Sequence, residues 1–272
     1  MSHVPEEHLD VLRDLRAAGR LIPFVGSGLS RPLGLPDWGN LIGLVGEQLG
    51  YDPDVFKLNG TDLQLAEYYV ASKGSIGPLR SLMDRAFNPA DDTIRDSRSH
   101  RALVDMKLPL IYTTNYDEII ERAFGLHGSR CHAIAGIDDI ARAPADATHV
   151  VKFHGTFSDD ASLVLTESSY FERLEFESAL DIKLRGDTLR GSLLFLGYSF
   201  SDINIRYLMY KLNKLRRAAR RTGRRDVPAA FLTTFGTGEI QRTILAQWGV
   251  AVIELDTVDK SGSTAQFLEA LT

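Results

Sequence analysis

Short runs of apolar residues alternate along the chain with longer stretches in which apolar residues recur at helical spacing. Uninterrupted runs of Val, Ile, Leu and Phe suit strands that are buried on both faces of a parallel sheet. Their alternation with helical periodicity is typical of repeated βαβ units. The pattern predicts six strands, at residues 21–25, 110–113, 150–153, 193–196, 229–233 and 250–255.

The helices between these strands carry recognisable end signals. We expect a helix over residues 7–18 that ends at Gly19 and another over residues 117–124 that ends at Gly125, since glycine is favoured directly after a helix. Either Ser201 or Asp202 is suited to cap the helix that runs to about residue 217.

More than 80 residues separate the first two strands, far more than one crossover helix needs. Within this segment, helical periodicity appears at residues 38–49, 63–71, 76–86 and 99–106. We therefore expect one domain over residues 1–272, with a small helical insertion lobe at residues 38–108 above the sheet edge. A second, shorter excursion covers residues 157–190.

Composition narrows the class of protein. The chain has 272 residues, 44% hydrophobic and 25% charged, which is typical of a folded globular protein. A single cysteine, Cys131, excludes an internal disulfide framework and a zinc site built from cysteine pairs. The polar start of the chain and its short apolar runs predict a cytoplasmic protein that does not enter the membrane. The net charge of −5 argues against bulk nucleic-acid binding.

Polar and glycine-rich turns follow four of the predicted strands. In open α/β sheets, ligands bind at the carboxyl ends of the strands. Each turn alone is compatible with ordinary turn chemistry, but four on one rim indicate a site. The four turns are Gly26-Ser27-Gly28, Thr114-Asn115-Tyr116-Asp117, His154-Gly155 and Gly197-Tyr198-Ser199.

The first turn partly matches a dinucleotide-binding GxGxxG loop. Its glycines would allow close approach to a pyrophosphate, with backbone amides as donors. The third glycine position holds Arg31, however, and Pro32 and Pro36 prevent a helix from starting directly behind the turn. The loop is therefore unlike that of an ordinary dehydrogenase, and without the required lysine it is not a P-loop.

A serine hydrolase is a weaker interpretation of the fourth turn. Residues 197–201 resemble GxSxG with the last glycine replaced. In α/β-hydrolases the histidine follows the serine along the chain. All seven histidines here precede Ser199, which argues against an esterase.

As a set, these turns resemble the motifs of the sirtuin superfamily, whose members use NAD as a substrate. Residues 26–30 and 34–38 resemble the GAGxS and GIPDF loop, residues 114–117 the TQNID segment, His154-Gly155 the catalytic histidine, and residues 197–199 the GTS turn. The order and spacing agree over about residues 20–200. The resemblance implies a doubly wound, mostly parallel, Rossmann-like α/β sheet of about six strands.

Departures from the sirtuin pattern also carry information. The two cysteine pairs of the deacylase zinc module are missing, and Gly39 and Asn40 stand where the family has an arginine. The chain in this respect resembles the sirtuin-like proteins of bacterial anti-phage defence. That resemblance implies hydrolysis of NAD to nicotinamide and ADP-ribose without a metal. It also implies an oligomer, in some systems beside a HerA-type ATPase or a short Argonaute.

The resemblance implies two catalytic residues. Asn115 would orient the water and the ribose hydroxyls, because an amide both donates and accepts hydrogen bonds. His154 would accept a proton, its ordinary pKa near 6.5 being suited to a base. The alternative for Asn115 is a turn residue, and for His154 a buried histidine satisfied by the backbone.

The remaining expected contacts follow from position. Asp117 resembles the aspartate that holds the nicotinamide carboxamide, and it also suits a helix N-cap. Asp37 and Trp38 would belong to the loop that closes over the nicotinamide ribose, unless Trp38 only anchors the lobe. The adenosine end is expected near Thr233, Thr234 and Asp256. The other expected NAD contacts are Gly26, Ser27, Gly28, Ser30, Thr114, Gly197 and Ser199.

Two further functions stay open from sequence alone: a regulatory module that binds NAD or ADP-ribose without turnover, and an NAD-dependent deacylase. The basic run at residues 211–225 carries eight Lys or Arg residues and no aromatic residue. It is interpreted as a solvated helix face, with a partner interface as the next choice and nucleic-acid contact as the last.

Overall fold

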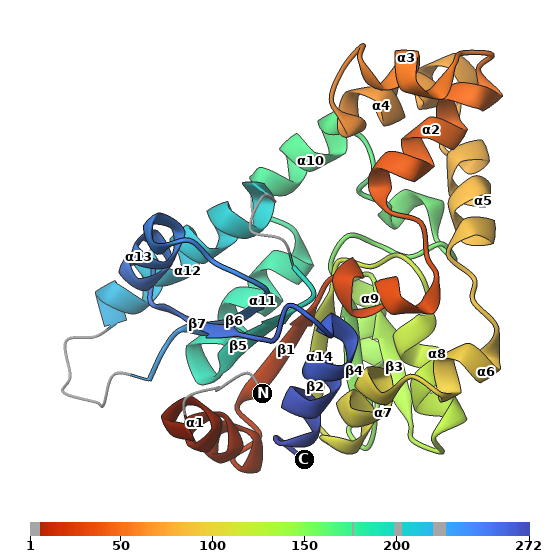
Figure 1. Cartoon of the computed structure of the whole chain (residues 1–272). Coiled ribbons are helices and arrows are strands. Elements are labelled where there is room, and N and C mark those ends of the chain that lie inside the picture. Colours follow the sequence, from red (N-terminus) through yellow and green to blue (C-terminus); the bar gives the residue numbers. More distant parts are fainter. Residues whose placement is uncertain (1–5, 176, 199–202, 220–226) are drawn as a thin grey trace.

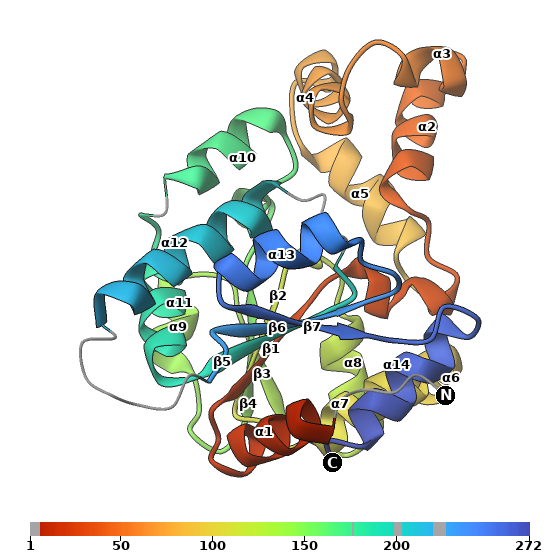
Figure 2. The same ribbon diagram turned by 60° about the vertical axis from the view of Figure 1, so that its left-hand side comes forward.

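A seven-stranded sheet with helices on both faces forms the body of the protein (Figures 1 and 2). The computed structural model describes residues 6–175, 177–198, 203–219 and 227–272. The strand order is β3-β4-β2-β1-β5-β6-β7, and every pair is parallel. The strands are β1 (Leu21–Val25), β2 (Leu110–Thr113), β3 (Cys131–Ile134), β4 (Thr148–Lys152), β5 (Ser192–Leu196), β6 (Ala230–Thr234) and β7 (Val250–Glu254).

Six of these strands correspond to the predicted apolar runs, with ends that differ by at most two residues. The prediction missed β3. This strand lies at the sheet edge, and of its four residues only Ile134 is buried. An edge strand with partly exposed Cys131 and His132 has no continuous apolar run, which is the signal that revealed the others.

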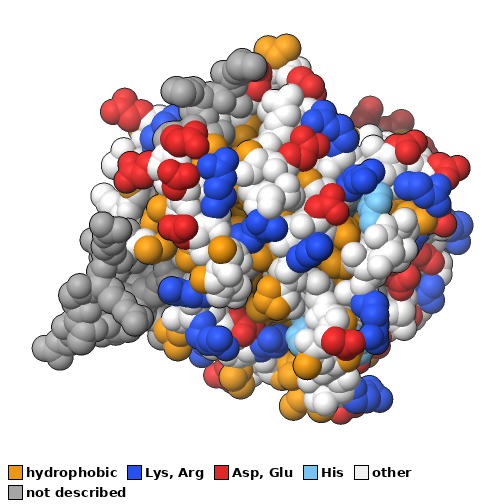
Figure 3. All heavy atoms as spheres, turned by 90° about the horizontal axis from the view of Figure 1, so that it is seen from below, with side chains coloured by type: hydrophobic (Ala, Val, Ile, Leu, Met, Phe, Trp, Pro, Cys, Tyr) orange, Lys and Arg blue, Asp and Glu red, His pale blue; other side chains and the backbone are white. Residues whose placement is uncertain are grey.

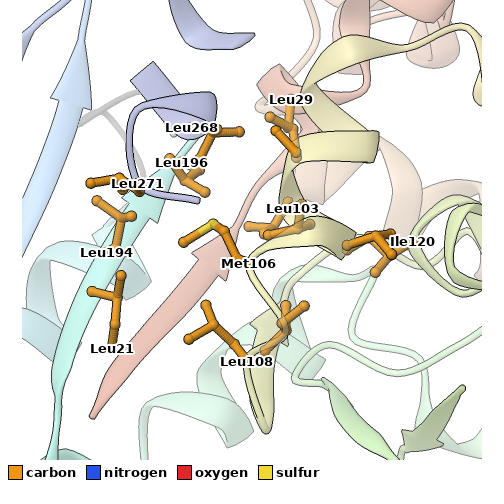
Figure 4. Close-up of a cluster of buried hydrophobic side chains, with 14 of the residues drawn as sticks. Leu21, Leu29, Leu103, Met106, Leu108, Ile120, Leu194, Leu196, Leu268 and Leu271 are labelled. Carbon is orange, nitrogen blue, oxygen red and sulfur yellow. The ribbon is translucent and has the colours of Figure 1, made fainter. Parts of the chain in front are cut away.

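Two apolar cores fill the two faces of the sheet. Side chains of β1 alternate between them: Leu21 and Val25 join one core, and Ile22 and Phe24 join the other. Leucines from the strands and from flanking helices interlock in the first core (Figure 4). Helices α1 (Glu6–Ala17), α7 (Arg98–Asp105), α8 (Ile119–Leu126) and α14 (Lys260–Glu269) contribute to it. Helices α9 (Ile137–Arg142), α11 (Ala179–Arg190), α12 (Ile203–Ala219) and α13 (Glu239–Gln247) cover the other face.

The helix ends confirm one prediction and correct another. Helix α1 is followed by Gly19 in the left-handed region, at φ +61°. Helix α8 begins at Ile119 rather than at residue 117 and continues through Gly125; the left-handed glycine after it is Gly128. The later start has a local cause, because the Asp117 carboxylate accepts a hydrogen bond from the Ile119 amide at 3.1 Å. The expected caps Ser201 and Asp202 lie outside the described residues.

The insertion between β1 and β2 forms a lobe with its own apolar cluster, beyond the carboxyl edge of the sheet (Figures 1 and 2). Its helices are α2 (Trp38–Gln48), α3 (Pro53–Lys57), α4 (Asp62–Lys73) and α5 (Gly77–Ala86). In contrast, α6 (Asp91–Arg95) and α7 bury Ile94 and Leu103 in the core under the sheet. We therefore propose that the lobe ends near residue 87 rather than at residue 108.

The surface seen from below mixes both signs of charge. Lysine and arginine side chains alternate there with aspartate and glutamate, with single apolar side chains between them (Figure 3). Among the described side chains on this face, the two signs of charge are therefore mixed and do not form one large patch of a single sign. Of the basic run at residues 211–225, the part beyond residue 219 lies outside the described residues; in the described part, the Lys211 ammonium lies over the Tyr207 ring at 5.0 Å.

The chain order places a ligand site at the centre of the sheet. From β1 the chain builds outward through β2, and after β4 it returns to β5 on the other side of β1. The carboxyl ends of β1 and β5 therefore flank the point where the direction of winding reverses. In doubly wound folds, ligands bind in the crevice at that point.

Glycines let the turns after β1 and β5 touch through their backbones. The Gly28 amide donates to the Gly197 carbonyl at 2.9 Å, and a Cβ on Gly28 would lie 2.6 Å from that oxygen. Gly197 has a φ of +70°, and a Cβ there would lie 2.3 Å from the Leu29 nitrogen. The contact thus requires glycine on both turns.

We expect Gly197→Ala to destabilise the protein by more than about 2 kcal/mol, because it adds a left-handed alanine and a backbone clash. Gly125→Ala is the matched control: it adds the same methyl inside α8, where nothing lies within 4 Å, and should stabilise by up to about 1 kcal/mol. Urea unfolding of both variants measures the difference. Equal unfolding free energies would contradict this account of the turn.

Candidate active site

Strands β2 and β4 bring Asn115 and His154 to the same edge of the sheet. Thr113 and Lys152 are paired in the parallel register, and each predicted catalytic residue lies two positions further along its chain. The Phe153 amide donates to the Thr113 carbonyl at 2.7 Å, which extends the pairing beyond the strands. The Tyr116 and His154 rings lie 6.5 Å apart between centroids, so the two turns are in contact.

The backbone of Asn115 is held by a hydrogen bond, whereas its side-chain Nδ2 makes none to the described residues. Its backbone amide donates to the Thr113 hydroxyl at 3.0 Å, and that hydroxyl donates to the Val25 carbonyl at 2.8 Å. The side chain is buried, yet its Nδ2 finds no hydrogen-bond partner among the described residues. A turn role accounts for the backbone bond, but a buried amide without a partner is costly unless a ligand or water supplies one.

His154 is 2% exposed, and its Nε2 has no hydrogen-bond partner in the described part of the chain. Its ring packs against those of Tyr116, Phe153 and Tyr170. The ring of His149, which lies within β4 five residues before His154, instead meets the Pro144 carbonyl at 2.8 Å. The backbone therefore satisfies His149 but leaves the Nε2 of His154 available.

Burial lowers the pKa of His154 to about 3, and the positive charge of Arg173 acts in the same direction. The pKa of His154 in the fold therefore lies well below the ordinary histidine value near 6.5. The cause is desolvation, which penalises the charged imidazolium. At neutral pH the ring is neutral and offers one nitrogen as a hydrogen-bond acceptor.

Arg173 lies next to His154 and was not found from the sequence. It belongs to α10 (Glu167–Leu174), and its guanidinium lies 4.1 Å from the centre of the Phe153 ring. Its Nη2 donates to the Phe153 carbonyl at 2.7 Å, and its Nη1 pairs with Asp181 at 3.4 Å. A cavity of about 140 Å³ lies beside it, lined among others by Phe153, Gly155 and Arg173. An arginine within a polar helix has no sequence feature that marks this role.

Asp117 is buried among charged groups that the sequence did not reveal. The Lys152 ammonium donates to its backbone carbonyl and pairs with the Glu121 carboxylate at 3.2 Å. Burial raises the pKa of both Asp117 and Glu121, and Lys152 opposes the rise in each case. The one signal in the sequence is a lysine inside an apolar strand, in the run VVKFHG.

The turn after β1 differs from the predicted phosphate cradle. The amides of Gly26, Gly28, Leu29 and Ser30 already donate to the carbonyls of Leu196, Gly197, Gly26 and Ser27. The prediction that this turn offers its amides to a phosphate is therefore wrong for these four in this conformation. Only the Ser27 amide is left without a protein acceptor among the described residues, and its side chain is exposed.

Ser30 does not face the rim. It is completely buried, and its hydroxyl lies 3.2 Å from Nε2 of His100 on α7. The other ring nitrogen of His100 lies 2.8 Å from the Ser97 hydroxyl. Ser30 therefore connects the turn to α7, away from the surface where a ligand would bind. The expected contact Ser199 lies outside the described residues.

The other predicted contacts serve local structure. Asp37 caps α2 by accepting from the Asn40 amide at 2.8 Å, and Trp38 packs against the lobe cluster. The Thr114 hydroxyl lies 2.8 Å from that of Tyr198, which also donates to the Val25 carbonyl. This bridge joins the turns after β1, β2 and β5.

At the expected adenosine end, hydroxyl and carboxylate groups already have partners. Thr233 is buried and donates to the Phe195 carbonyl at 3.0 Å. The Thr234 hydroxyl accepts from Thr237 at 3.1 Å, and the Asp256 carboxylate accepts from the Val258 amide at 2.8 Å. The adenosine contacts therefore stay a prediction.

The described ranges of the chain contain neither a metal-binding cluster nor a membrane-spanning helix. No group of three or more His, Cys, Asp or Glu side chains is arranged to hold a metal ion there. None of the helices in those ranges is both long and apolar enough to cross a membrane.

Sequence comparison decides the family. Residues 109–253, more than half of the chain, match the sequence model of the SIR2-like domain. The chain belongs to the SIR2-like domain family. The matched segment begins just before β2 and ends within β7, so it includes both Asn115 and His154.

Curated relatives of this SIR2-like chain are longer proteins. It is 31% identical over 196 residues to the NAD(+) hydrolase ThsA of Enterococcus faecium, covering 70% of this chain and 39% of that protein. ThsA of Bacillus cereus (strain MSX-D12) is 29% identical over 205 residues, with coverage of 74% and 41%. Defense-associated sirtuin 2 of Bacillus subtilis is 26% identical over 208 residues, with coverage of 73% and 20%. The chain thus spans about two fifths or less of these relatives.

A solved structure described as "Structural Basis for the Mechanism and Regulation of Sir2 Enzymes" is similar in fold. It aligns with a TM-score of 0.49 and 14% sequence identity, covering 100% of this chain and 98% of that one.

We expect acid to destabilise the SIR2-like domain through its buried histidines. Burial lowers the pKa of His100 to about 4 and that of His154 to about 3. Below pH 6.5 the unfolded chain therefore binds more protons than the folded chain, so the free energy of unfolding falls as the pH falls, down to about pH 4 for His100. Each such histidine contributes a slope of about 1.4 kcal/mol per pH unit.

His100→Gln should flatten this slope between pH 6.5 and pH 4 by about 1.4 kcal/mol per pH unit. Urea unfolding at several pH values measures it. Gly125→Ala, which changes no titratable group, is the control and should keep the wild-type slope. A His100→Gln slope equal to that of the wild type would contradict the prediction.

Proposed function

We propose that this SIR2-like chain hydrolyses the N-glycosidic bond of NAD+, releasing nicotinamide and ADP-ribose. Relatives that match most of its length are named NAD(+) hydrolases. The observation that carries the proposal is a pair of buried polar atoms at neighbouring strand ends, Nδ2 of Asn115 and Nε2 of His154, which have no hydrogen-bond partner among the described residues. Asn115 follows β2, the neighbour of β1, and His154 follows β4, the next strand along the sheet. Doubly wound folds bind ligands at this carboxyl edge.

The chemistry needs little from the protein. Nicotinamide leaves as a neutral molecule from a cationic pyridinium, so no general acid has to protonate it. The C1′–N bond breaks with its electron pair going to the nicotinamide nitrogen, and the ribose gains oxocarbenium character. The water oxygen then bonds to C1′, and the water proton must leave. The site therefore has to hold the dinucleotide, orient the ribose and accept one proton.

Asn115 and His154 match these requirements. The Asn115 amide can donate from Nδ2 while its carbonyl accepts, which suits a water or a ribose hydroxyl and adds no charge. His154 is neutral and buried, so it can accept a hydrogen bond from the attacking water and pass the proton on to solvent. A buried neutral acceptor is already desolvated, and its environment need not reorganise in the reaction.

The pyrophosphate is assigned to the turns after β1 and β5. Ser27 contributes an exposed hydroxyl and a backbone amide without a protein acceptor in the described structure. The contacts of Asp117, Thr114 and the Asp37–Trp38 segment with the nicotinamide ribose stay predictions. A role in anti-phage defence, an oligomeric state, and a HerA-type ATPase or short Argonaute partner also stay predictions.

Asn115→Ala and His154→Ala should each lower kcat for NAD cleavage by about 100-fold to 10,000-fold. Each variant removes a polar atom that has no hydrogen-bond partner among the described residues, and the thermal midpoint of each variant checks that it stays folded. Asn213→Ala is the matched control: Asn213 is a buried asparagine on α12 whose side chain donates to the Gln247 carbonyl, far along the chain from the site. Chromatographic measurement of nicotinamide release compares the three.

The alternatives predict different results in the same assay. A deacylase would consume NAD only when an acylated peptide is added. A binding module without turnover would release no nicotinamide at all. Wild-type turnover in Asn115→Ala or His154→Ala would contradict the assignment of these residues.

A further inference from the structure

A buried lysine lies below the Asn115 turn and has no part in the proposed chemistry. Lys152 is the last residue of β4 and is 1% exposed. Its ammonium donates to the Asp117 carbonyl and pairs with the Glu121 carboxylate at 3.2 Å. It is among the largest completely buried side chains described in the protein.

Stability alone does not explain this lysine. Burying an ammonium group costs several kcal/mol, and an ion pair in the interior only partly offsets that cost. Apolar residues of similar volume often replace such a pair without loss of stability. The strand already has apolar neighbours at Val150 and Val151, so an apolar residue would suit position 152.

The contacts of Lys152 point to the turn that carries Asn115. One end of the turn is held where the Asn115 amide donates to the Thr113 hydroxyl at 3.0 Å. The other end is held where the Asp117 carbonyl accepts from Lys152. Between them, Tyr116 donates from its hydroxyl to the Val164 carbonyl at 2.7 Å. The turn is also held where the Thr114 amide donates to the Val25 carbonyl and where the Phe157 amide donates to the Tyr116 carbonyl, each at 3.3 Å. Among these contacts, that of Lys152 joins the turn to the last residue of β4.

We propose that Lys152 is a positioning residue for NAD cleavage: it holds the 114–117 turn against β4 so that the Asn115 amide faces His154. The link is direct, because Lys152 and His154 are two residues apart on the same chain segment. Glu121 balances the charge of the lysine from α8. This inference rests on the proposed function for its effect on rate, but its effect on the turn is independent of NAD.

The test replaces the buried pair as a unit. Lys152→Met alone leaves the Glu121 carboxylate buried without its cation and is expected to destabilise the fold. The double variant Lys152→Met/Glu121→Leu removes both charges of the pair and should recover part of the thermal midpoint that Lys152→Met loses; the recovery is partial because buried Asp117 has also lost its lysine partner. The matched control is Arg98→Met/Glu269→Leu, which removes an ion pair between α7 and α14, with contacts of 3.0 and 2.7 Å.

Two measurements separate positioning from stability. In the Lys152→Met/Glu121→Leu variant, kcat for NAD cleavage should fall about 10-fold to 100-fold, while KM changes less than about threefold. Hydrogen–deuterium exchange should become at least about threefold faster at the amides of residues 114–118, because the turn has lost one anchor. The Arg98→Met/Glu269→Leu control should match the wild type in both measurements.

The outcomes are distinguishable. A double variant that folds and keeps both wild-type kcat and wild-type exchange at residues 114–118 overturns the inference, and so does a double variant that changes only its thermal midpoint. If the wild type releases no nicotinamide, the proposed function fails, and the exchange rates alone decide whether Lys152 holds the turn.

Discussion

The backbone contact between the turns after β1 and β5 is the constraint on which the site depends. The Gly28 amide meets the Gly197 carbonyl at a distance that no side chain at either position would permit. This contact closes the centre of the carboxyl edge, where the winding of the sheet reverses. Tyr198 directly follows Gly197, and its hydroxyl hydrogen-bonds with the Thr114 hydroxyl and the Val25 carbonyl. The turn after β2 is thereby joined to the turns after β1 and β5.

Desolvation gives this rim its chemical character. Asn115, Asp117, His154 and Lys152 are all buried, although each belongs to a polar residue type. In such surroundings the His154 ring is neutral. Its Nε2 has no hydrogen-bond partner among the described residues, which costs stability but leaves this nitrogen available to a ligand or water. The polar groups that do have partners act on the backbone: Arg173 holds the Phe153 carbonyl and Lys152 holds that of Asp117. Charge thus fixes the positions of the turns, whereas the two residues proposed to act on NAD, Asn115 and His154, are neutral.

Much of the fold could be predicted because strands buried on both faces are continuous apolar runs. The prediction missed the edge strand β3 because half-exposed residues such as His132 interrupt the apolar run. Asn115 and His154 could be found because they follow such strands, and parallel register then places them together. Arg173 and Ser30 show the limit. Their roles depend on side-chain direction and on helices distant along the chain, and neither leaves a periodic signal.

The glycines of the first turn show a second limit of prediction from the sequence. Gly26 and Gly28 could be recognised as positions of close approach, but the sequence does not name the approaching partner. The structure shows it to be the Gly197 backbone, with most of the amides already in use. Of the amides of residues 26–30, only that of Ser27 lacks a protein acceptor among the described residues.

Hydrogen–deuterium exchange of the His154→Ala variant with and without NAD tests the location of the site most directly, because NAD remains intact while it is bound. The account predicts that NAD slows exchange in residues 26–38, 113–118 and 152–156 and leaves the groove between Tyr210 and Trp248 unchanged. Slower exchange confined to that groove, or to the amino edge of the sheet, would contradict it.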